Sequence, residues 1–356
     1  MRWVGVATVA VWSAFAGSGS SAGFGGRSAG VEVKVNEAAR RVDVTIDGRP
    51  FTSYIWPSTL KKPVLYPLRS ARGTLVTRGF PLDPRQGERV DHPHHVGVWL
   101  THGDVNGLDF WNSSEAIKAA DAAKMGTIYH RRIVNVKSGA AQGELTVETA
   151  WMTPDNTQLL RETTRFIFRG GADSRSVDRI TTLTALDRKV VFQDNKEAFF
   201  GMRVARGLEQ PSDKPEVFTD ASGKATAVPV LDNTRATGKY VSSEGRQGDA
   251  VWGTRGKWNM LSGTVDGEPL TVAILDHPSN PGYPTHWHAR GYGLFAANPL
   301  GDAIFNEKPF NLTLEPGASV TFKYRVLILA GRSTPDRIEH ESRAFAQEGS
   351  TPTGNR

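Results

Sequence analysis

The chain has 356 residues, of which 38% are hydrophobic and 22% charged, as is typical of globular proteins with a buried core. Its net charge of +6 is modest and no dense run of Lys and Arg occurs, so the composition gives no indication of nucleic-acid binding. The absence of cysteine excludes disulfides, thiolate metal sites and cysteine nucleophiles.

The N-terminal segment has the pattern of a secretory signal peptide. Arg2 precedes an apolar run from Trp3 to Phe15, and Ala14-Phe15-Ala16 matches a small-x-small cleavage site. This run is too short for a stable membrane span, and no later stretch is apolar enough for one. We therefore expect residues 1–30 to be a signal peptide and flexible tail, and the protein to be secreted or periplasmic. The alternative is an uncleaved anchor or a disordered tail.

Short runs of alternating apolar and polar residues dominate the chain from residue 31 onward. This alternation, with many β-branched residues, predicts half-buried antiparallel strands, and the 37 glycines and 20 prolines mark turns between them. No linker or fixed-period repeat divides the pattern, so we predict one all-β domain over 31–332, a large antiparallel two-sheet sandwich. The clearest runs are Val31–Val35, Val42–Ile46, Thr127–Val136, Leu145–Trp151, Thr163–Phe168, Asp178–Leu183, Leu270–Leu275 and Val320–Leu329.

Helix signals are confined to two segments. Ser114–Met125 begins with a residue suited to an N-cap and has an Ala-rich body. Thr334–Gln347 begins Thr334-Pro335-Asp336 and carries spaced apolar residues. We therefore expect one or two short helices, the second within a C-terminal segment, 333–356, that ends in a tail.

Four of the chain's 9 histidines lie in the segment Asp91–Asp109. Pro93 disfavours a helix at His92, and in an extended chain His92 and His94 would share one face while His95 points to the other. Val96–Leu100 predicts a strand with His102 just beyond its end. Imidazole carries protons near neutral pH and binds metals, so His92, His94 and His102 are candidates for a metal or acid–base site.

Asp104 could join that site, and Trp111 closes the segment as a candidate substrate-binding ring. Three alternatives stay open here. Asp104 and Asn106 could only shape the tight turn that Asn106-Gly107 predicts, and His95 could be a hydrogen-bonded core residue. The pattern Asp104-x-Asn106-x-x-Asp109 also offers oxygen ligands for calcium, although its spacing departs from the EF-hand loop.

The segment Asp276–Tyr292 carries three more histidines. His277 follows a strand and lies beside Asp276, which could orient it. If the later part is extended, His286 and His288 share one face, and Arg290 and Tyr292 continue it. Such a row, with Trp287 nearby, suits a cleft in which rings pack on sugar C–H groups and cations bind hydroxyls or carboxylates. The alternative is a rim stiffened by ordinary hydrogen bonds.

A third candidate is the run from Lys196 to Arg203. Glu197 adjoins an apolar, strand-like stretch, where a carboxyl group can serve as a general acid or base. Arg203 could pair with Glu197 or with an anionic substrate. The alternative is that Lys196 and Glu197 form only a surface ion pair.

A metal site needs three or four ligands, and a divalent ion such as zinc, copper or iron accepts neutral imidazole. His92, His94, His286 and His288 form a sensible set only if the two histidine segments adjoin. The same side chains serve equally well as acid–base groups without any metal, and the sequence pattern does not separate these alternatives.

The run Asp91-His92-Pro93-His94-His95-x-Gly97-x-Trp99, together with His102-Gly103-Asp104-Val105-Asn106-Gly107-x-Asp109-Phe110-Trp111, resembles the PmoA-like family of bacterial proteins. Further matching stretches are 76–81, 196–197, 200–203, 275–281, 286–288 and 293–299. The resemblance implies a secreted bacterial protein associated with polysaccharide breakdown. It also implies a large sandwich similar to mutarotase-like and polysaccharide-lyase proteins, which is an analogy of fold rather than of function.

These observations lead to one principal hypothesis: a secreted carbohydrate-active enzyme that performs hydrolysis, elimination or epimerisation by His/Glu acid–base chemistry on a carbohydrate or other small molecule. The candidate catalytic residues are His92, His94, His102, Glu197, His277, His286 and His288. The candidate substrate-binding residues are Asp104, Trp111, Arg203, Trp287, Arg290 and Tyr292. The alternatives are a metal-dependent oxygenase with histidine ligands and a non-catalytic glycan-binding module.

Overall fold

The structure is a computed structural model that describes residues 30–348 together with Met1. The predicted signal peptide with its cleavage site, and the tail beyond residue 348, lie outside the described residues. No helix among the described residues is long and apolar enough to cross a membrane.

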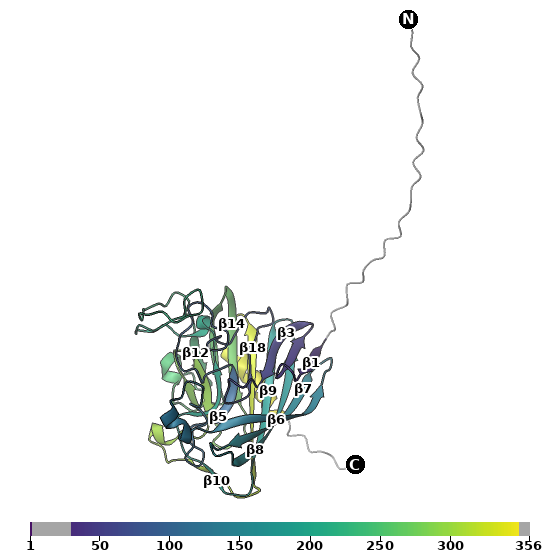
Figure 1. Cartoon of the computed structure of the whole chain (residues 1–356). Helices are drawn as coiled ribbons and strands as arrows, with labels where there is room; N and C mark the ends of the chain where they lie inside the picture. The colour runs from purple at the N-terminus through teal and green to yellow at the C-terminus, as the bar shows by residue number, and fades with distance from the viewer. Residues whose placement is uncertain (2–29, 349–356) are drawn as a thin grey trace.

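Two eight-stranded antiparallel sheets make up most of residues 30–348 (Figure 1). In spatial order, the first sheet contains β1 (Val31–Asn36), β2 (Arg41–Ile46), β3 (Arg49–Ile55), β4 (Val64–Leu65), β5 (Val98–His102), β11 (Ala198–Arg203), β16 (Leu294–Asn298) and β15 (His286–Ala289). The second contains β12 (Lys239–Ser242), β13 (Trp258–Val265), β14 (Glu268–Asp276), β18 (Ser319–Ala330), β9 (Ser174–Ala185), β8 (Gln158–Gly170), β7 (Gly143–Met152) and β6 (Thr127–Lys137). A separate pair joins β10 (Val190–Phe192) to β17 (Leu312–Leu314).

Helices contribute little to this architecture. The α-helix is α1 (Pro335–Gln347), and the 3₁₀ turns are η1 (Ala119–Lys124), η2 (Arg206–Leu208), η3 (Gly248–Val251) and η4 (Ala303–Phe305). The predicted two-sheet antiparallel sandwich is thus confirmed, and each alternating run named above lies within a strand.

The two helix predictions had different outcomes. The helix over 334–347 is confirmed, and the Thr334 hydroxyl caps it by accepting a hydrogen bond from the Arg337 backbone N–H. The helix over 114–125 is wrong in extent, because only the 3₁₀ turn η1 forms there. None of the residues in η1 is buried, so no packing supports the helical preference of its alanines.

Alternation along the strands divides the apolar side chains among three layers. The largest cluster fills the space between the sheets, with contributions such as Leu100 and Phe200 from the first sheet and Phe166 and Val326 from the second. On the outer face of the second sheet, α1 packs through Ile338 and Phe345. The outer face of the first sheet carries a third cluster, which includes Val64, Val96, Trp99, Trp111, Leu294 and Ala296.

The register of the first sheet places one row of side chains across this outer face. Trp99 pairs with Gly201, Gly201 pairs with Ala296, and Ala296 pairs with His288. Residues from β5, β11, β16 and β15 therefore lie side by side, although about 190 residues separate the ends of the row in the sequence.

Candidate functional site

The first histidine segment forms a tight turn rather than an extended strand. The His95 backbone N–H donates to the His92 carbonyl at 2.9 Å, and His92 has a φ of +42°. Pro93 occupies the second position of this turn, where its fixed φ is favourable. The predicted alternation of His92, His94 and His95 is therefore wrong, and His95 belongs with the other two. Its ring lies 4.3 Å from that of His94 and stacks on His92 at 4.8 Å.

Aromatic contacts join this turn to the second histidine segment. The His95 ring stacks on Trp99 with centroids 5.2 Å apart, and it meets Trp111 edge-on at 5.6 Å. Trp111 in turn lies parallel to His288 at 6.4 Å. Tyr292, from the turn after β15, stacks on His92 at 5.0 Å. We call these seven residues the histidine cluster: His92, His94, His95, Trp99, Trp111, His288 and Tyr292.

An ion-pair network around Asp91 fixes the position of the turn 92–95. The Asp91 carboxylate pairs with Arg203 at 2.6 Å and with Arg78, and both guanidinium groups are fully buried. Burial alone would raise the pKa of Asp91, but Arg203, the hydrogen bond from His92 and Arg78 outweigh it and hold this pKa well below its usual range. Arg203 thus pairs with Asp91 rather than with Glu197, and its guanidinium lies 4.8 Å from the Tyr292 ring.

Burial keeps three imidazoles of the cluster uncharged at neutral pH. It lowers the pKa of His94 to about 2 and that of His288 to about 3, and it holds the pKa of His95 well below the ordinary value. Nearby cations, such as Lys62 beside His94 and Arg290 beside His288, act in the same direction. A neutral imidazole offers one N–H donor and one nitrogen that accepts a hydrogen bond or a proton.

Several buried polar atoms of the cluster have no hydrogen-bond partner among the described residues. They are Nε2 of His94, Nε2 of His95, Nε1 of Trp99, Nε1 of Trp111 and Nδ1 of His288. Most buried polar groups in native proteins are paired, since leaving one unpaired costs on the order of 1–3 kcal/mol. The gathering of such atoms from four segments of the chain indicates a site for a ligand with several hydrogen-bonding groups.

Two residues important to this site were missed in the sequence. Lys62 is buried beside the cluster, with its ammonium 3.3 Å from the Trp111 carbonyl and 5.6 Å from the Trp99 ring. Burial lowers its pKa to about 7, against the opposing effect of Asp109. Lys62 lies two residues before the strand residue Val64, so it continues the same face, and this spacing was the available signal.

Gly201 is the second residue that the sequence did not single out. A Cβ atom at this position would lie 2.7 Å from the Trp99 ring and 3.1 Å from the Trp111 ring. The missing side chain therefore leaves space for both indoles on the outer face. A glycine inside a predicted strand often marks such a close approach.

Two cavities flank the histidine cluster. One of about 600 Å³ lies on the side of Lys62 and His94, between the segments 59–64, 81–82, 93–96 and 113–116. The other, of about 370 Å³, lies on the side of Tyr292 and Arg290. The Arg290 guanidinium lies over the Trp252 ring at 5.0 Å, so Arg290 and Tyr292 do line a polar hollow beside the cluster.

His102 and Trp287 lie on the inner face of the first sheet rather than in the site. His102 donates from Nε2 to the Gln193 carbonyl at 2.6 Å and packs against Phe192 and Phe199. Trp287 is fully buried in the core between the sheets. Both placements follow from alternation, because each residue lies an odd number of positions from the outward-facing residue of its own strand, Trp99 or His288.

Asp104 stabilises a turn instead of facing the cluster. Its carboxylate accepts a hydrogen bond from the Gly107 backbone N–H at 2.8 Å. The Asn106 side chain is likewise used, since it bonds the backbone of Lys189 and Val191. These contacts agree with the turn-shaping alternative for this loop.

His277 lies on the far side of the molecule. It directly follows β14 of the second sheet, its Nδ1 is 2.8 Å from the Ser279 hydroxyl, and its ring meets Phe345 of α1 edge-on at 5.1 Å. The candidate catalytic residue His277 therefore lies apart from the histidine cluster.

His286 shares a face with His288 on β15 but contacts a different group of residues. Its Nε2 lies 3.2 Å from Asp302, which directly precedes η4, and 3.6 Å from Glu307, which follows η4. Among the described residues, these three form the group whose potential ligand atoms all lie within 4.8 Å of one another. The set His92, His94, His286 and His288 therefore does not form one coordination sphere.

The group of His286, Asp302 and Glu307 fits a metal ion poorly. Arg255 donates to Asp302 at 2.8 Å and to Glu307 at 3.0 Å, so a guanidinium already pairs with both carboxylates. A divalent cation at this position would have to displace the Arg255 guanidinium or bind against the repulsion of its positive charge. These residues form an ion-pair network, and we derive no metal chemistry from them.

Glu197 lies at the edge of the cluster. Its side chain is 24% exposed and pairs with Lys196 at 3.4 Å, as the surface-pair alternative expected. Glu197 is also near enough to Tyr292 to affect its ionisation. Burial raises the pKa of Tyr292 to about 12, Arg203 and Arg290 lower it, and Glu197 raises it further.

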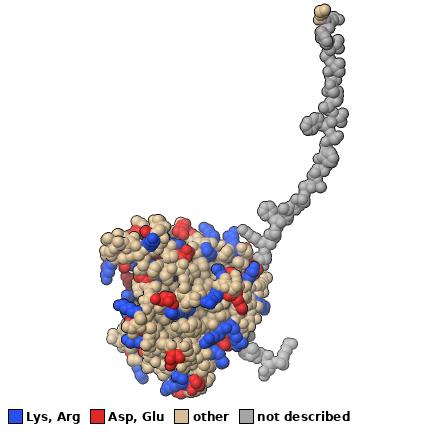
Figure 2. All heavy atoms as spheres, in the orientation of Figure 1, with Lys and Arg blue, Asp and Glu red and all other residues tan. Residues whose placement is uncertain are grey.

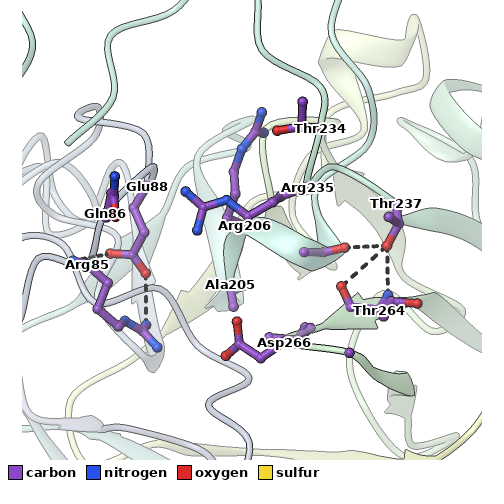
Figure 3. A pocket seen from close by; sticks show the side chains of 13 residues that line it. Arg85, Gln86, Glu88, Ala205, Arg206, Thr234, Arg235, Thr237, Thr264 and Asp266 are labelled. Atoms are coloured by element: carbon purple, nitrogen blue, oxygen red, sulfur yellow. Dashed lines mark hydrogen bonds and ion pairs between the residues drawn. The ribbon is translucent and has the colours of Figure 1, made fainter. Parts of the chain in front are cut away.

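A further pocket of about 340 Å³ lies away from these residues, between the loop 85–88, η2 and the turn 264–267 (Figure 3). Two arginines line it: Arg85 pairs with Glu88 at 2.9 Å, and Arg206 pairs with Glu209 at 2.5 Å. No histidine lines it, and its charges are largely balanced. Basic and acidic side chains are also interspersed over the face of the molecule in Figure 2.

Comparison with known proteins gives a family match and distant structural likenesses. A family model described as "Family of unknown function (DUF6807)" matches residues 41–343. No curated protein sequence matches the chain. The protein Slr1438 of Synechocystis sp. PCC 6803 is 10% identical with a TM-score of 0.28, over 87% of this chain and 99% of that one. A galactose mutarotase related enzyme from Lactobacillus acidophilus is 10% identical with a TM-score of 0.28, over 85% and 98%. At such TM-scores we base no conclusion on these likenesses.

Proposed function

Because the chain belongs to the DUF6807 family, whose function is unknown, we propose a function from the site itself: an enzyme that binds a carbohydrate at the histidine cluster and transfers protons on it. The observation that carries this proposal is the convergence of five buried, unpartnered ring nitrogens from the turn 92–95, β5, the loop at Trp111 and β15. Sugar hydroxyls both donate and accept hydrogen bonds, so they complement this mixture of N–H donors and imidazole acceptors.

The neutral imidazoles and Lys62 have different roles. His94 and His288 are uncharged at pH 7 and offer hydrogen-bonding ring nitrogens to a sugar, while Lys62, whose pKa burial lowers to about 7, is suited to take up and return a proton near neutral pH. Glycoside hydrolysis generally uses a pair of carboxyl groups. Here Asp91 is held by two arginines and Glu197 pairs with a lysine, so epimerisation or elimination suits the residues better than hydrolysis.

The two alternatives receive less support from the residues. A glycan-binding module presents exposed aromatic rings, whereas Trp99 and Trp111 are fully buried. An oxygenase needs a ligand set around one metal, and the four histidines once considered for it are divided between two groups. Metal analysis of the purified protein distinguishes the oxygenase: a stoichiometric transition metal would contradict a metal-free acid–base mechanism.

His94→Ala and His288→Ala test the proposal. Each removes an imidazole that would position the sugar by hydrogen bonding, so we expect turnover to fall by about 10²-fold while the fold persists. Proton NMR in D₂O, with reducing sugars and uronate-containing oligosaccharides as substrates, measures deuterium incorporation and product formation together. The matched control is His277→Ala, which removes an imidazole from the opposite sheet and should leave turnover unchanged. Full activity in both His94 and His288 variants would refute the proposal.

Secretion is part of this proposal and has its own test. The N-terminal pattern predicts export, so fractionation of expressing cells should recover the protein outside the cytoplasm, shortened at its N-terminus near Ala16. Full-length protein confined to the cytoplasm would contradict it. The resemblance to the PmoA-like family stays a prediction and contributes no step to the proposed chemistry.

A further inference from the structure

The cavity of about 600 Å³ beside the histidine cluster has mainly apolar walls and one charged end. Leu60, Val64, Leu82, Pro93 and Val96 contribute apolar wall surface, and Lys62 and His94 contribute polar groups. Binding sites for small organic molecules commonly have this size and this composition, with a few polar groups that fix the orientation of the ligand.

Lys62 is an unusual cation because it is buried without a counter-ion. Its exposed fraction is 5%, and it forms no ion pair with the described residues. Its one hydrogen bond goes to the Trp111 carbonyl at 3.3 Å. The nearest influential acid is Asp109, whose carboxylate accepts hydrogen bonds from the backbone of Trp111 and Asn112. An isolated buried ammonium is costly, and an anion beside it offsets that cost.

His94 places a second polar group on the same cavity. Besides burial, the charge of Lys62 contributes to the lowered pKa of His94, so the two side chains lie near each other. Nε2 of His94 is itself buried and has no hydrogen-bond partner among the described residues. The other charges at the rim are already matched, since Lys61 pairs with Glu115 at 2.6 Å.

We propose that this cavity binds a carboxylate with an apolar, planar body, such as an aryl carboxylic acid, whose carboxylate accepts a hydrogen bond from Lys62. One buried ammonium balances one carboxylate, whereas a phosphate dianion would call for more cations than line the cavity. The apolar walls favour an aryl body over a sugar ring, which would leave hydroxyls without partners there. Although His94 is shared with the histidine cluster, this proposal does not depend on sugar turnover.

Proton exchange should accompany binding. Since burial lowers the pKa of Lys62 to about 7, part of the free protein carries a neutral amine at pH 8, and an anion beside it favours the ammonium form. The groups that face Lys62 are Asp109, which raises its pKa, and His94, which stays neutral; Lys61 and Glu115 lie at the rim. Binding should therefore take up protons at pH 8 and weaken as the pH rises further.

Isothermal titration calorimetry with cinnamate and cinnamamide tests the proposal on the full chain. These ligands share one shape and differ in charge, so we expect cinnamate to bind at least about tenfold more tightly. Lys62→Met keeps the length of the side chain without its charge, and it should abolish the preference. The control Lys118→Met removes an exposed lysine near the cavity and should preserve it. Titrations at pH 8 in two buffers of different ionisation enthalpy should show proton uptake.

A second measurement covers the case in which Lys62→Met fails to fold. Acetylation of wild-type Lys62, followed by mass spectrometry, should be slowed by cinnamate and unaffected by cinnamamide. Equal binding of the two ligands, or no binding of either, would overturn the proposal. If glucuronate bound in a Lys62-dependent way and cinnamate did not, the proposal that the ligand has an apolar body would be contradicted. None of these experiments measures turnover, so they test carboxylate binding independently of the proposed proton transfer on a carbohydrate.

Discussion

The outer faces of the two sheets are built from similar strands but have opposite characters. On the second sheet, α1 covers the face and two of its polar neighbours are paired: the Trp258 indole donates to Glu339 at 2.8 Å, and Arg325 pairs with Asp178 at 2.5 Å. One ring nitrogen there, Nε2 of His277, has no partner among the described residues. On the first sheet, the indoles of Trp99 and Trp111 are just as buried but have no partner among the described residues.

The difference lies in how closely the unpaired atoms gather. Single unpaired polar atoms also occur in the core, such as Nε1 of Trp287 and the Tyr324 hydroxyl, whereas five belong to adjoining rings of the histidine cluster. When several buried atoms converge without partners, the free energy that they cost in the empty protein is recovered when a ligand supplies the missing hydrogen bonds. The first sheet thus carries the site because its outer face gives up some stability, and substitutions on the two faces should have different consequences.

The largest effect on stability is expected on the second sheet. Phe345→Ala removes an aromatic ring that α1 packs against His277 and Arg325. We expect the free energy of unfolding to fall by about 3 kcal/mol, as for other buried aromatic truncations. Urea titration followed by tryptophan fluorescence measures it. Carbohydrate and cinnamate binding should persist in the folded variant, so a loss of binding there would contradict the separation of the two faces.

A smaller effect on stability, but a large one on binding, is expected on the first sheet. Gly201→Ala places a methyl group 2.7 Å from Trp99 and 3.1 Å from Trp111. Such overpacking costs about 1–3 kcal/mol and must displace one of the indoles. Urea titration and ligand calorimetry on the same variant provide the comparison. Gly267→Ala is the control for glycine removal, since its new methyl would meet nothing within 4 Å, although its φ of +82° adds some strain. Unchanged binding in Gly201→Ala would argue against the cluster as the site.

The third effect is negligible at neutral pH and appears only on acidification, in the pH dependence of stability. Burial lowers the pKa of His102 to about 4, below the value near 6.5 of an unfolded chain. The unfolded state therefore binds more protons between these values, and the stabilisation present above pH 6.5 is lost as the pH falls toward 4. His102→Gln retains a donor for the Gln193 carbonyl but does not titrate. Its unfolding free energy should vary less with pH, by up to about 1.4 kcal/mol per pH unit. Parallel slopes for both proteins would contradict the buried neutral histidine.

Local patterns in the sequence predicted the framework well. Strand alternation and the Thr334 cap depend on neighbouring residues, so the sandwich and α1 could be predicted without tertiary information. The helix over 114–125 failed because helical preference alone does not hold a short segment that buries nothing.

The site was predicted less completely, because its composition depends on contacts across the fold. His94 and His288 were identified because histidines cluster in the sequence. In the structure, the His94 ring contacts His95, and the His288 ring lies parallel to Trp111. The turn at Pro93 changed the role of His95, and the strand register turned His102 inward. Lys62 carried no motif, and only its burial without a counter-ion distinguishes it from the other lysines.

The order of strands in the first sheet has a consequence for how the protein folds. β5 pairs with β11, yet β6, β7, β8 and β9 of the second sheet lie between them in the chain, and β16 and β15 follow nearly 90 residues later. Pairings between such distant segments form slowly, because the loops that they close are long. During synthesis, most of the sandwich has emerged before His288 can reach Trp111. We therefore expect ligand binding to appear only with the last stage of folding, so a ligand added to refolding protein should report completion of the native state.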